Sequence, residues 1–71
     1  MSEADKMFEE LGYEKYEIKD IIQYVSKGTD TIAFEIPLKA INLFALNYEA
    51  KRINIQELKA INKKVEELGW N

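Results

Sequence analysis

The chain has 71 residues, of which 46% are hydrophobic and 32% charged, and it contains neither cysteine nor histidine. This composition predicts one small globular domain over residues 1–71 rather than a disordered chain. The lack of cysteine excludes a disulfide framework and a thiolate zinc site, so the core alone must stabilise the fold. Nucleophilic catalysis by the usual Cys–His and Ser–His pairs is excluded as well.

The net charge of −3 is unevenly distributed along the chain. Residues 1–20 carry seven acids and three lysines (−4), whereas residues 51–71 carry three acids and five bases (+2). An acidic protein repels nucleic acid at long range, which argues against nucleic acid as the partner. No segment approaches the ~20 apolar residues of a membrane span. Since the first residues are also acidic rather than basic, we expect a soluble cytoplasmic protein that binds no membrane.

The first predicted helix spans roughly Ser2–Leu11. Ser2 is a favourable N-cap, and acidic residues follow it in the first turn, where the helix dipole favours them. Four apolar side chains then recur at helical spacing: Ala4, Met7, Phe8 and Leu11. Gly12 provides a left-handed stop, after which Tyr13 can fold back onto Phe8.

The middle of the chain begins with an ambiguous segment. Tyr16–Ser26 fits a helical pattern through Ile18, Ile21, Ile22 and Val25, but its isoleucine, tyrosine and valine content favours a strand, which we place at Ile21–Ser26. The turn signal Lys27–Asp30 and the strand-like Thr31–Ile36 behind it favour a hairpin. We therefore predict two paired strands here.

A third strand is predicted at Ile41–Leu46, after the interruption at Pro37. Pro37 could instead occupy the first position of a short helix, so residues 38–46 are open to both interpretations. The strand is preferred because it extends the hairpin into a meander.

The last predicted helix has a complete set of end signals. Asn54 and Glu57 form a capping box, and Gly69 followed by Trp70 is typical of a Schellman ending. Its apolar stripe comprises Leu58, Ile61, Val65 and Leu68. The predicted fold is therefore α+β with the order α-β-β-β-α: a three-stranded antiparallel meander with both helices packed on one face.

The face of the sheet away from the helices is the main candidate site. If Ser26 pairs with Thr31, the helices cover Ile21, Val25, Ile32, Phe34 and Ile36, joined by Ile41, Leu43 and Ala45. The opposite face then carries an apolar patch that we take as a candidate protein interface: Ile22, Tyr24, Phe44 and Leu46. Exposed patches of this kind mark interfaces more often than monomer surfaces. A register shifted by one residue, or a covering loop, is the alternative explanation.

The basic C-terminal end is a second candidate. Lys51, Arg52, Lys59 and Lys63 could contact a phosphate backbone, with Lys59 and Lys63 on one face of the helix. The simpler interpretation is that these residues form the solvated side of an amphipathic helix.

Chemistry at the remaining charged residues is not expected. Neighbouring carboxylates such as Glu9–Glu10 and Glu66–Glu67 lie on polar helix faces, whereas a hydrolytic or metal site needs carboxylates that converge in a dry pocket. The glycines are isolated and do not form a phosphate loop. We predict no enzyme activity, no cofactor and no metal.

Three segments carry a resemblance. Lys6–Lys15, Ile32–Ile36 and above all Ile55–Trp70, with its stretch Glu57–Lys64, resemble small proteins of unassigned activity that are encoded by phages and prophages of Gram-positive bacteria. The resemblance covers about half the chain and only loosely its middle. It implies a phage or prophage origin and a bacterial host cytoplasm, but no chemistry. We therefore expect a non-enzymatic accessory protein that binds another protein or itself, with a nucleic-acid-associated factor as the alternative.

Overall fold

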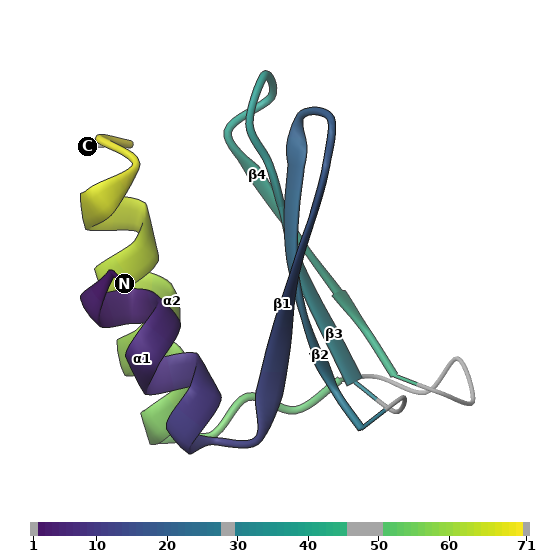
Figure 1. Ribbon diagram of the computed structural model, residues 1–71, viewed down its shortest axis with the longest axis vertical. Helices are drawn as coiled ribbons and strands as arrows, with labels where there is room; N and C mark the ends of the chain where they lie inside the picture. The colour runs from purple at the N-terminus through teal and green to yellow at the C-terminus, as the bar shows by residue number, and fades with distance from the viewer. Residues whose placement is uncertain (1, 28–29, 46–50, 71) are drawn as a thin grey trace.

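The computed structural model describes residues 2–27, 30–45 and 51–70. Its elements are α1 (Glu3–Glu10), β1 (Tyr13–Ile18), β2 (Ile21–Ser26), β3 (Asp30–Glu35), β4 (Ala40–Phe44) and α2 (Ile55–Glu67). The strands form one antiparallel sheet in the order β1-β2-β3-β4, and both helices lie against the same face of it (Figure 1). The α+β class is confirmed, and the predicted number of strands was wrong, since the sheet has four strands and not three.

β1 is the strand that the sequence pattern did not reveal. Only Tyr13 of its six residues is buried, so the segment lacks the apolar alternation of a half-buried strand. Ile18 and Ile21 pair across a turn in which Lys19 has a φ of 50°. Glycine or asparagine normally marks such a left-handed position, and neither is present here. β1 is therefore held by its pairing with β2 and not by burial of an apolar face.

The register of β2 against β3 differs from the prediction by one residue. Ser26 pairs with Asp30, whereas we expected Thr31. Because side chains alternate between the faces, this shift turns every β2 side chain to the other side of the sheet. Ile22 and Tyr24 therefore face the helices. Two residues that were predicted in the core lie instead on the open face: Ile21 and Val25.

Tyr24 explains why this register is preferred. Its ring stacks on that of Phe8 with the centroids 3.9 Å apart, and it meets the ring of Phe34 edge-on at 5.8 Å. Its hydroxyl donates a 2.6 Å hydrogen bond to Asp5. A buried tyrosine whose hydroxyl has a partner contributes both apolar area and a satisfied polar group. Neither β-branched alternative on β2 can offer this combination.

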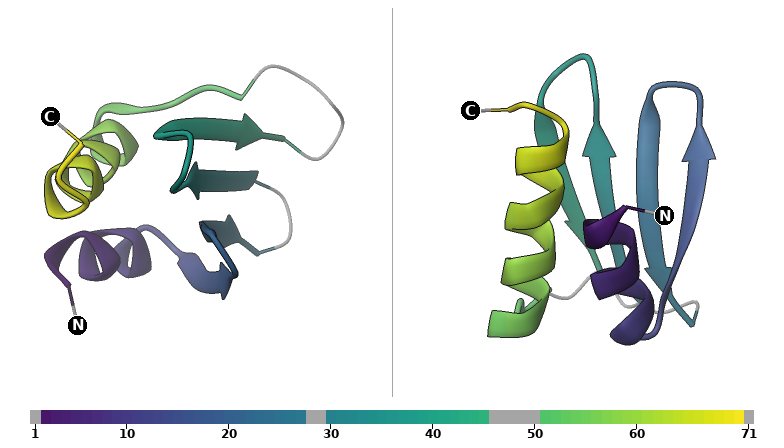
Figure 2. Two further views of the ribbon diagram at one scale, coloured as in Figure 1. Left: turned by 90° about the horizontal axis from the view of Figure 1, so that it is seen from above. Right: turned by 60° about the vertical axis from the view of Figure 1, so that its left-hand side comes forward.

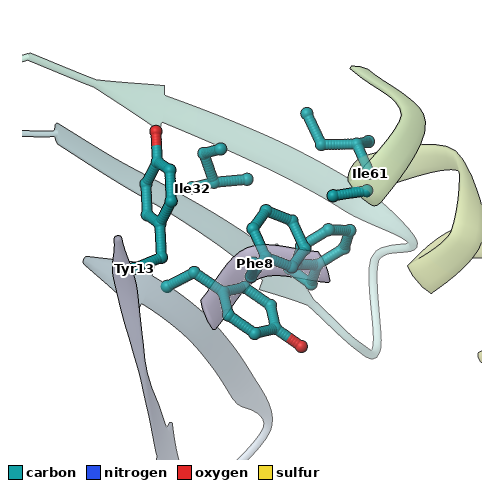
Figure 3. Packing of buried hydrophobic residues seen from close by; sticks show 7 residues of the cluster. Phe8, Tyr13, Ile32 and Ile61 are labelled. Carbon is teal, nitrogen blue, oxygen red and sulfur yellow. The ribbon is translucent and has the colours of Figure 1, made fainter. Parts of the chain in front are cut away.

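The core lies between the sheet and the two helices. Figure 3 shows buried aromatic and aliphatic side chains packed together, with Phe8, Tyr13, Ile32 and Ile61 labelled. The cluster of buried residues comprises Phe8, Tyr13, Tyr24, Ile32, Phe34, Ala60 and Ile61. The predicted faces of β3 and β4 are confirmed, because Ile32 and Phe34 are fully buried and Ile41 packs against the cluster. The C-terminal Trp70 closes one side, with its ring 6.1 Å from that of Phe34.

The predicted helix ends are confirmed. Ser2 caps α1 by accepting a hydrogen bond from the backbone N–H of Asp5, and Asn54 caps α2 in a capping box with Glu57. At the end of α2, Trp70 donates its N–H to the carbonyl of Val65 at 3.1 Å, and Gly69 has a φ of 74°. These bonds form the Schellman motif that the sequence predicted.

The buried face of α2 is rotated from the predicted stripe. Leu58, which begins that stripe, is 42% exposed, while Glu57 and Lys64 are 8% and 6% exposed. No helix in the described part of the chain is both long and apolar enough to cross a membrane.

Candidate functional site

No described helix covers the face of the sheet opposite α1 and α2 (Figure 2). We call it the open face. Its side chains form three rows across the strands, which run Glu14–Val25–Thr31–Phe44, Tyr16–Gln23–Ala33–Asn42 and Ile18–Ile21–Glu35–Ala40. In the middle row the small Ala33 is buried between two polar neighbours. The outer rows carry Val25, Phe44, Ile18 and Ile21, and Tyr16 lies at the β1 end of the middle row.

Four large apolar side chains on the open face are strongly exposed. Tyr16 is 48% exposed, Ile18 56%, Ile21 38% and Phe44 54%. Three of them lie on the β1–β2 hairpin, and Val25 lies diagonally beside Tyr16 on the same surface. Phe44 lies apart from this group on β4, because Thr31 stands between it and Val25 in the same row. Exposed apolar side chains grouped as they are on the hairpin of a small domain are typical of a contact with another molecule.

The charged groups of the open face are acidic. Glu14 accepts a 2.9 Å hydrogen bond from the Tyr16 hydroxyl, and Glu35 accepts one from the side-chain amide of Asn42. Among the described strand residues of this face there is no lysine or arginine. The open face therefore combines apolar groups with negative charge.

In the observed register, the predicted interface residues lie on different faces of the sheet. Phe44 lies on the open face as expected. Ile22 and Tyr24 do not, because both face the helices and Tyr24 is only 1% exposed. Leu46 lies outside the described residues. Tyr16 and Ile18 were not predicted on this face, and their signal is limited to the two-residue spacing between them.

The predicted basic site is largely occupied by ion pairs. The Nζ atom of Lys51 lies 3.0 Å from Glu57 Oε2 and 3.3 Å from Asp30 Oδ2, and its side chain is only 4% exposed. Lys63 pairs with Glu3 at 3.6 Å and with Glu66 at 3.3 Å. Arg52 and Lys59 are exposed. Two of the four predicted phosphate contacts, Arg52 and Lys59, are therefore exposed at the surface.

One buried ionic network surrounds Glu57 at the start of α2. Its carboxylate accepts hydrogen bonds from the Tyr13 hydroxyl, from Lys51 and from the backbone N–H of Asn54. Burial opposes ionisation of Glu57, but these donors outweigh it and hold its pKa below the ordinary value. Burial and the adjacent carboxylate raise the pKa of Tyr13 to about 12. The network ties α2 to β1 and to the start of β3.

A second network surrounds Asp5 on α1. Besides the Tyr24 hydroxyl, Asp5 binds Lys15 at 2.8 Å and Lys64 at 3.4 Å. Burial disfavours the charged form, yet the bonds from Lys15 and Tyr24 and the charge of Lys64 hold the pKa of Asp5 well below its ordinary range. Glu67 of α2 adds a further tie, because it accepts a 2.9 Å hydrogen bond from the backbone N–H of Ala4.

These networks have a structural role. Among the described residues every buried side-chain nitrogen and oxygen has a hydrogen-bond partner. Within those residues no group of three histidine, cysteine or acidic side chains could hold a metal ion. The depression between α1 and β1 is lined by Asp5, Glu9, Tyr13, Glu14, Lys15 and Tyr24. Because Asp5 and Tyr24 already satisfy each other there, the open face is the stronger candidate.

Comparisons with protein-family models, with curated proteins and with solved structures gave no match.

Proposed function

We propose that the chain is a small non-enzymatic interaction module that binds a partner protein through the open face of its sheet. The observation that carries this proposal is the exposure of Tyr16, Ile18, Ile21 and Phe44 on one uncovered surface, at 38% to 56% each. Burying an apolar side chain is worth about 1.5–3 kcal/mol when it is fully removed from water. Because the four side chains are 38% to 56% exposed, each can still gain roughly half of that value, and together they can contribute several kcal/mol to a specific contact.

The charge of the open face defines the partner. Glu14 and Glu35 favour a protein that presents apolar side chains flanked by lysine or arginine. Face-to-face packing of two copies would instead bring four carboxylates into one interface, which is unfavourable. Nucleic acid is the less favoured partner for the same reason, since phosphates and these carboxylates repel each other.

The resemblance of both chain ends to phage and prophage proteins of Gram-positive bacteria supports an accessory role in that setting. We propose that it acts in the cytoplasm of the bacterial host cell. An accessory module needs no chemistry of its own, because it acts by occupying a surface of a larger protein.

The test is affinity capture from host lysate with variants of the open face. Ile18→Asp and Phe44→Asp should each abolish recovery of the partner, because each places a charge among groups that must lose water. Leu38→Asp is the matched control, since Leu38 is 71% exposed in the β3–β4 turn and outside this face. Circular dichroism should show all three variants folded.

The partner's chemistry and the salt dependence complete the test. Binding should survive nuclease and ~0.5 M salt, because apolar contacts are not screened, and the captured protein should carry a basic rim around an apolar centre. Recovery that is equal for Ile18→Asp and the wild type would refute the open face as the site. Recovery that disappears with nuclease, or with Lys59→Glu, would instead support nucleic-acid binding.

A further inference from the structure

The two edges of the sheet differ in how they are protected. The edge strand β1 carries three charges within Tyr13–Ile18: Glu14, Lys15 and Glu17. The edge strand β4 carries none within Ala40–Phe44. Charged side chains on an edge strand oppose pairing with another chain, whereas an uncharged edge presents its backbone N–H and C=O groups freely. β4 is therefore the edge that can accept a further strand.

A second observation at the same edge comes from α2. Its contacts with α1 run through Lys64 and Glu67, so the flank that carries Leu58 and Ile55 points away from α1. α2 lies beside the β3–β4 half of the sheet and α1 beside the β1–β2 half (Figure 2, left). On this side Leu43 is 37% exposed, Leu58 42% and Ile55 62%. Apolar side chains thus remain in water on the flank of α2 that points away from α1, on the β3–β4 half of the molecule.

We infer that β4 pairs with β4 of a second copy of the chain, as antiparallel strands related by a two-fold axis perpendicular to the sheet. With Asn42 at the axis, Leu43 of one copy lies beside Ile41 of the other on the helix side. On the open side Phe44 lies beside Ala40 of the second copy. The product is one continuous sheet with four strands from each copy.

The chemistry of the edge selects a second copy over an unrelated strand. A two-fold contact places the same surface on both partners, so any charge on it would meet its own image. β4 has no charge to repel, and the residues on either side of Asn42 are all apolar. The two-fold axis also brings the flank of each α2 towards its symmetry mate, which covers Leu58 and Ile55. An added segment of a different protein would cover them only if it brought its own apolar layer.

This inference does not depend on the proposed function, because the open face stays uncovered in the dimer. Both open faces point to the same side, so a dimer presents two copies of that surface in one plane. Binding a partner with two sites would then gain from multivalency. Loss of the dimer and loss of partner binding are separable with Leu43→Lys and Ile18→Asp, whereas Phe44→Asp affects both because Phe44 also lies at the two-fold contact.

The test is the mass of the protein in solution across a range of concentrations. Light scattering and sedimentation equilibrium should give about twice the chain mass of 8.3 kDa for the wild type. Leu43→Lys and Leu58→Lys should each raise the dimer dissociation constant at least tenfold. Ile18→Lys is the matched control, because Ile18 is 56% exposed on the other edge strand, and it should leave the dimer intact.

Hydrogen exchange of the wild type locates the contact without any substitution. Dilution from the dimer to the monomer should accelerate exchange of amides in β4 and leave those in β1 unchanged. A wild type that stays at 8.3 kDa at ~0.5 mM would overturn the inference, and so would a dimer whose β4 amides exchange equally fast on dilution. The capture of the partner protein by Leu43→Lys, measured separately, reports on the open face alone.

Discussion

Replacing Lys51 by methionine isolates the buried ionic network at the start of α2. The methionine keeps the apolar stem of the side chain and removes its charge, which lies 3.0 Å from Glu57 and 3.3 Å from Asp30. Removing one member of a buried ion pair costs about 3–5 kcal/mol, because the other charge is left without compensation. Glu57 retains its bonds from Tyr13 and Asn54, and Asp30 is half-exposed, so we expect a smaller loss of about 2–3 kcal/mol.

Such a loss is large for a domain of this size, whose free energy of unfolding is roughly 4–10 kcal/mol. Urea unfolding followed by the fluorescence of Trp70 measures it directly, because this single tryptophan packs 6.1 Å from Phe34. Arg52→Met is the matched control, since Arg52 is exposed, and it should change the stability by less than about 0.5 kcal/mol. A Lys51→Met protein as stable as this control would refute a stabilising role of Lys51 in the buried ionic network around Glu57.

The same network predicts a dependence on pH and a coupling. Since the pKa of Glu57 is lowered in the folded protein, the contribution of Lys51 is present above the ordinary pKa of glutamate and is lost as the pH falls through the folded value. The difference between the wild type and Lys51→Met should therefore shrink on acidification. The double variant Lys51→Met/Glu57→Gln should lose less unfolding free energy than the sum of the losses in the two single variants, by about 1 kcal/mol or more.

Two further predictions concern the other end of the core and the helix stop. Asp5→Asn should lower the free energy of unfolding at pH 7 and make that free energy fall less steeply in acid. The reason is that the depressed pKa of Asp5 contributes stability above about pH 4 that is lost at lower pH. Urea unfolding at pH 7, 4 and 2.5 would contradict this if the wild type and Asp5→Asn lost equal stability. Gly69→Ala should lower the free energy of unfolding by about 1–2 kcal/mol. Gly69 has a φ of 74° and an added Cβ meets nothing within 4 Å, so only backbone strain acts. Gly69→Asn should lose less stability than Gly69→Ala in thermal unfolding, and an equal loss for both would argue against the left-handed conformation.

The candidate site was only partly accessible to sequence reasoning. Phe44 was placed on the open face because the predicted third strand put Ile41 and Leu43 on the helix side and the alternate residues on the other side. Tyr16 and Ile18 were missed since β1 buries only its first residue and turns through a lysine, with no glycine to mark the hairpin. The basic residues were interpreted as a solvated face. Spacing alone does not reveal that the side chain of Lys51 pairs with Glu57 and that of Lys64 with Asp5, both largely shielded from solvent.

The sequence by itself determined the features that depend on a few neighbouring residues. Ser2, Asn54 and Gly69 each act through hydrogen bonds within one helical turn, so their patterns predicted both helices and their ends. Only the tertiary structure decided the face of β2. Both faces of that strand are apolar, and one residue of register exchanges Ile21 and Val25 for Ile22 and Tyr24. The choice depends on Phe8 and Asp5, which lie far away in sequence and meet Tyr24 only when α1 packs against the sheet.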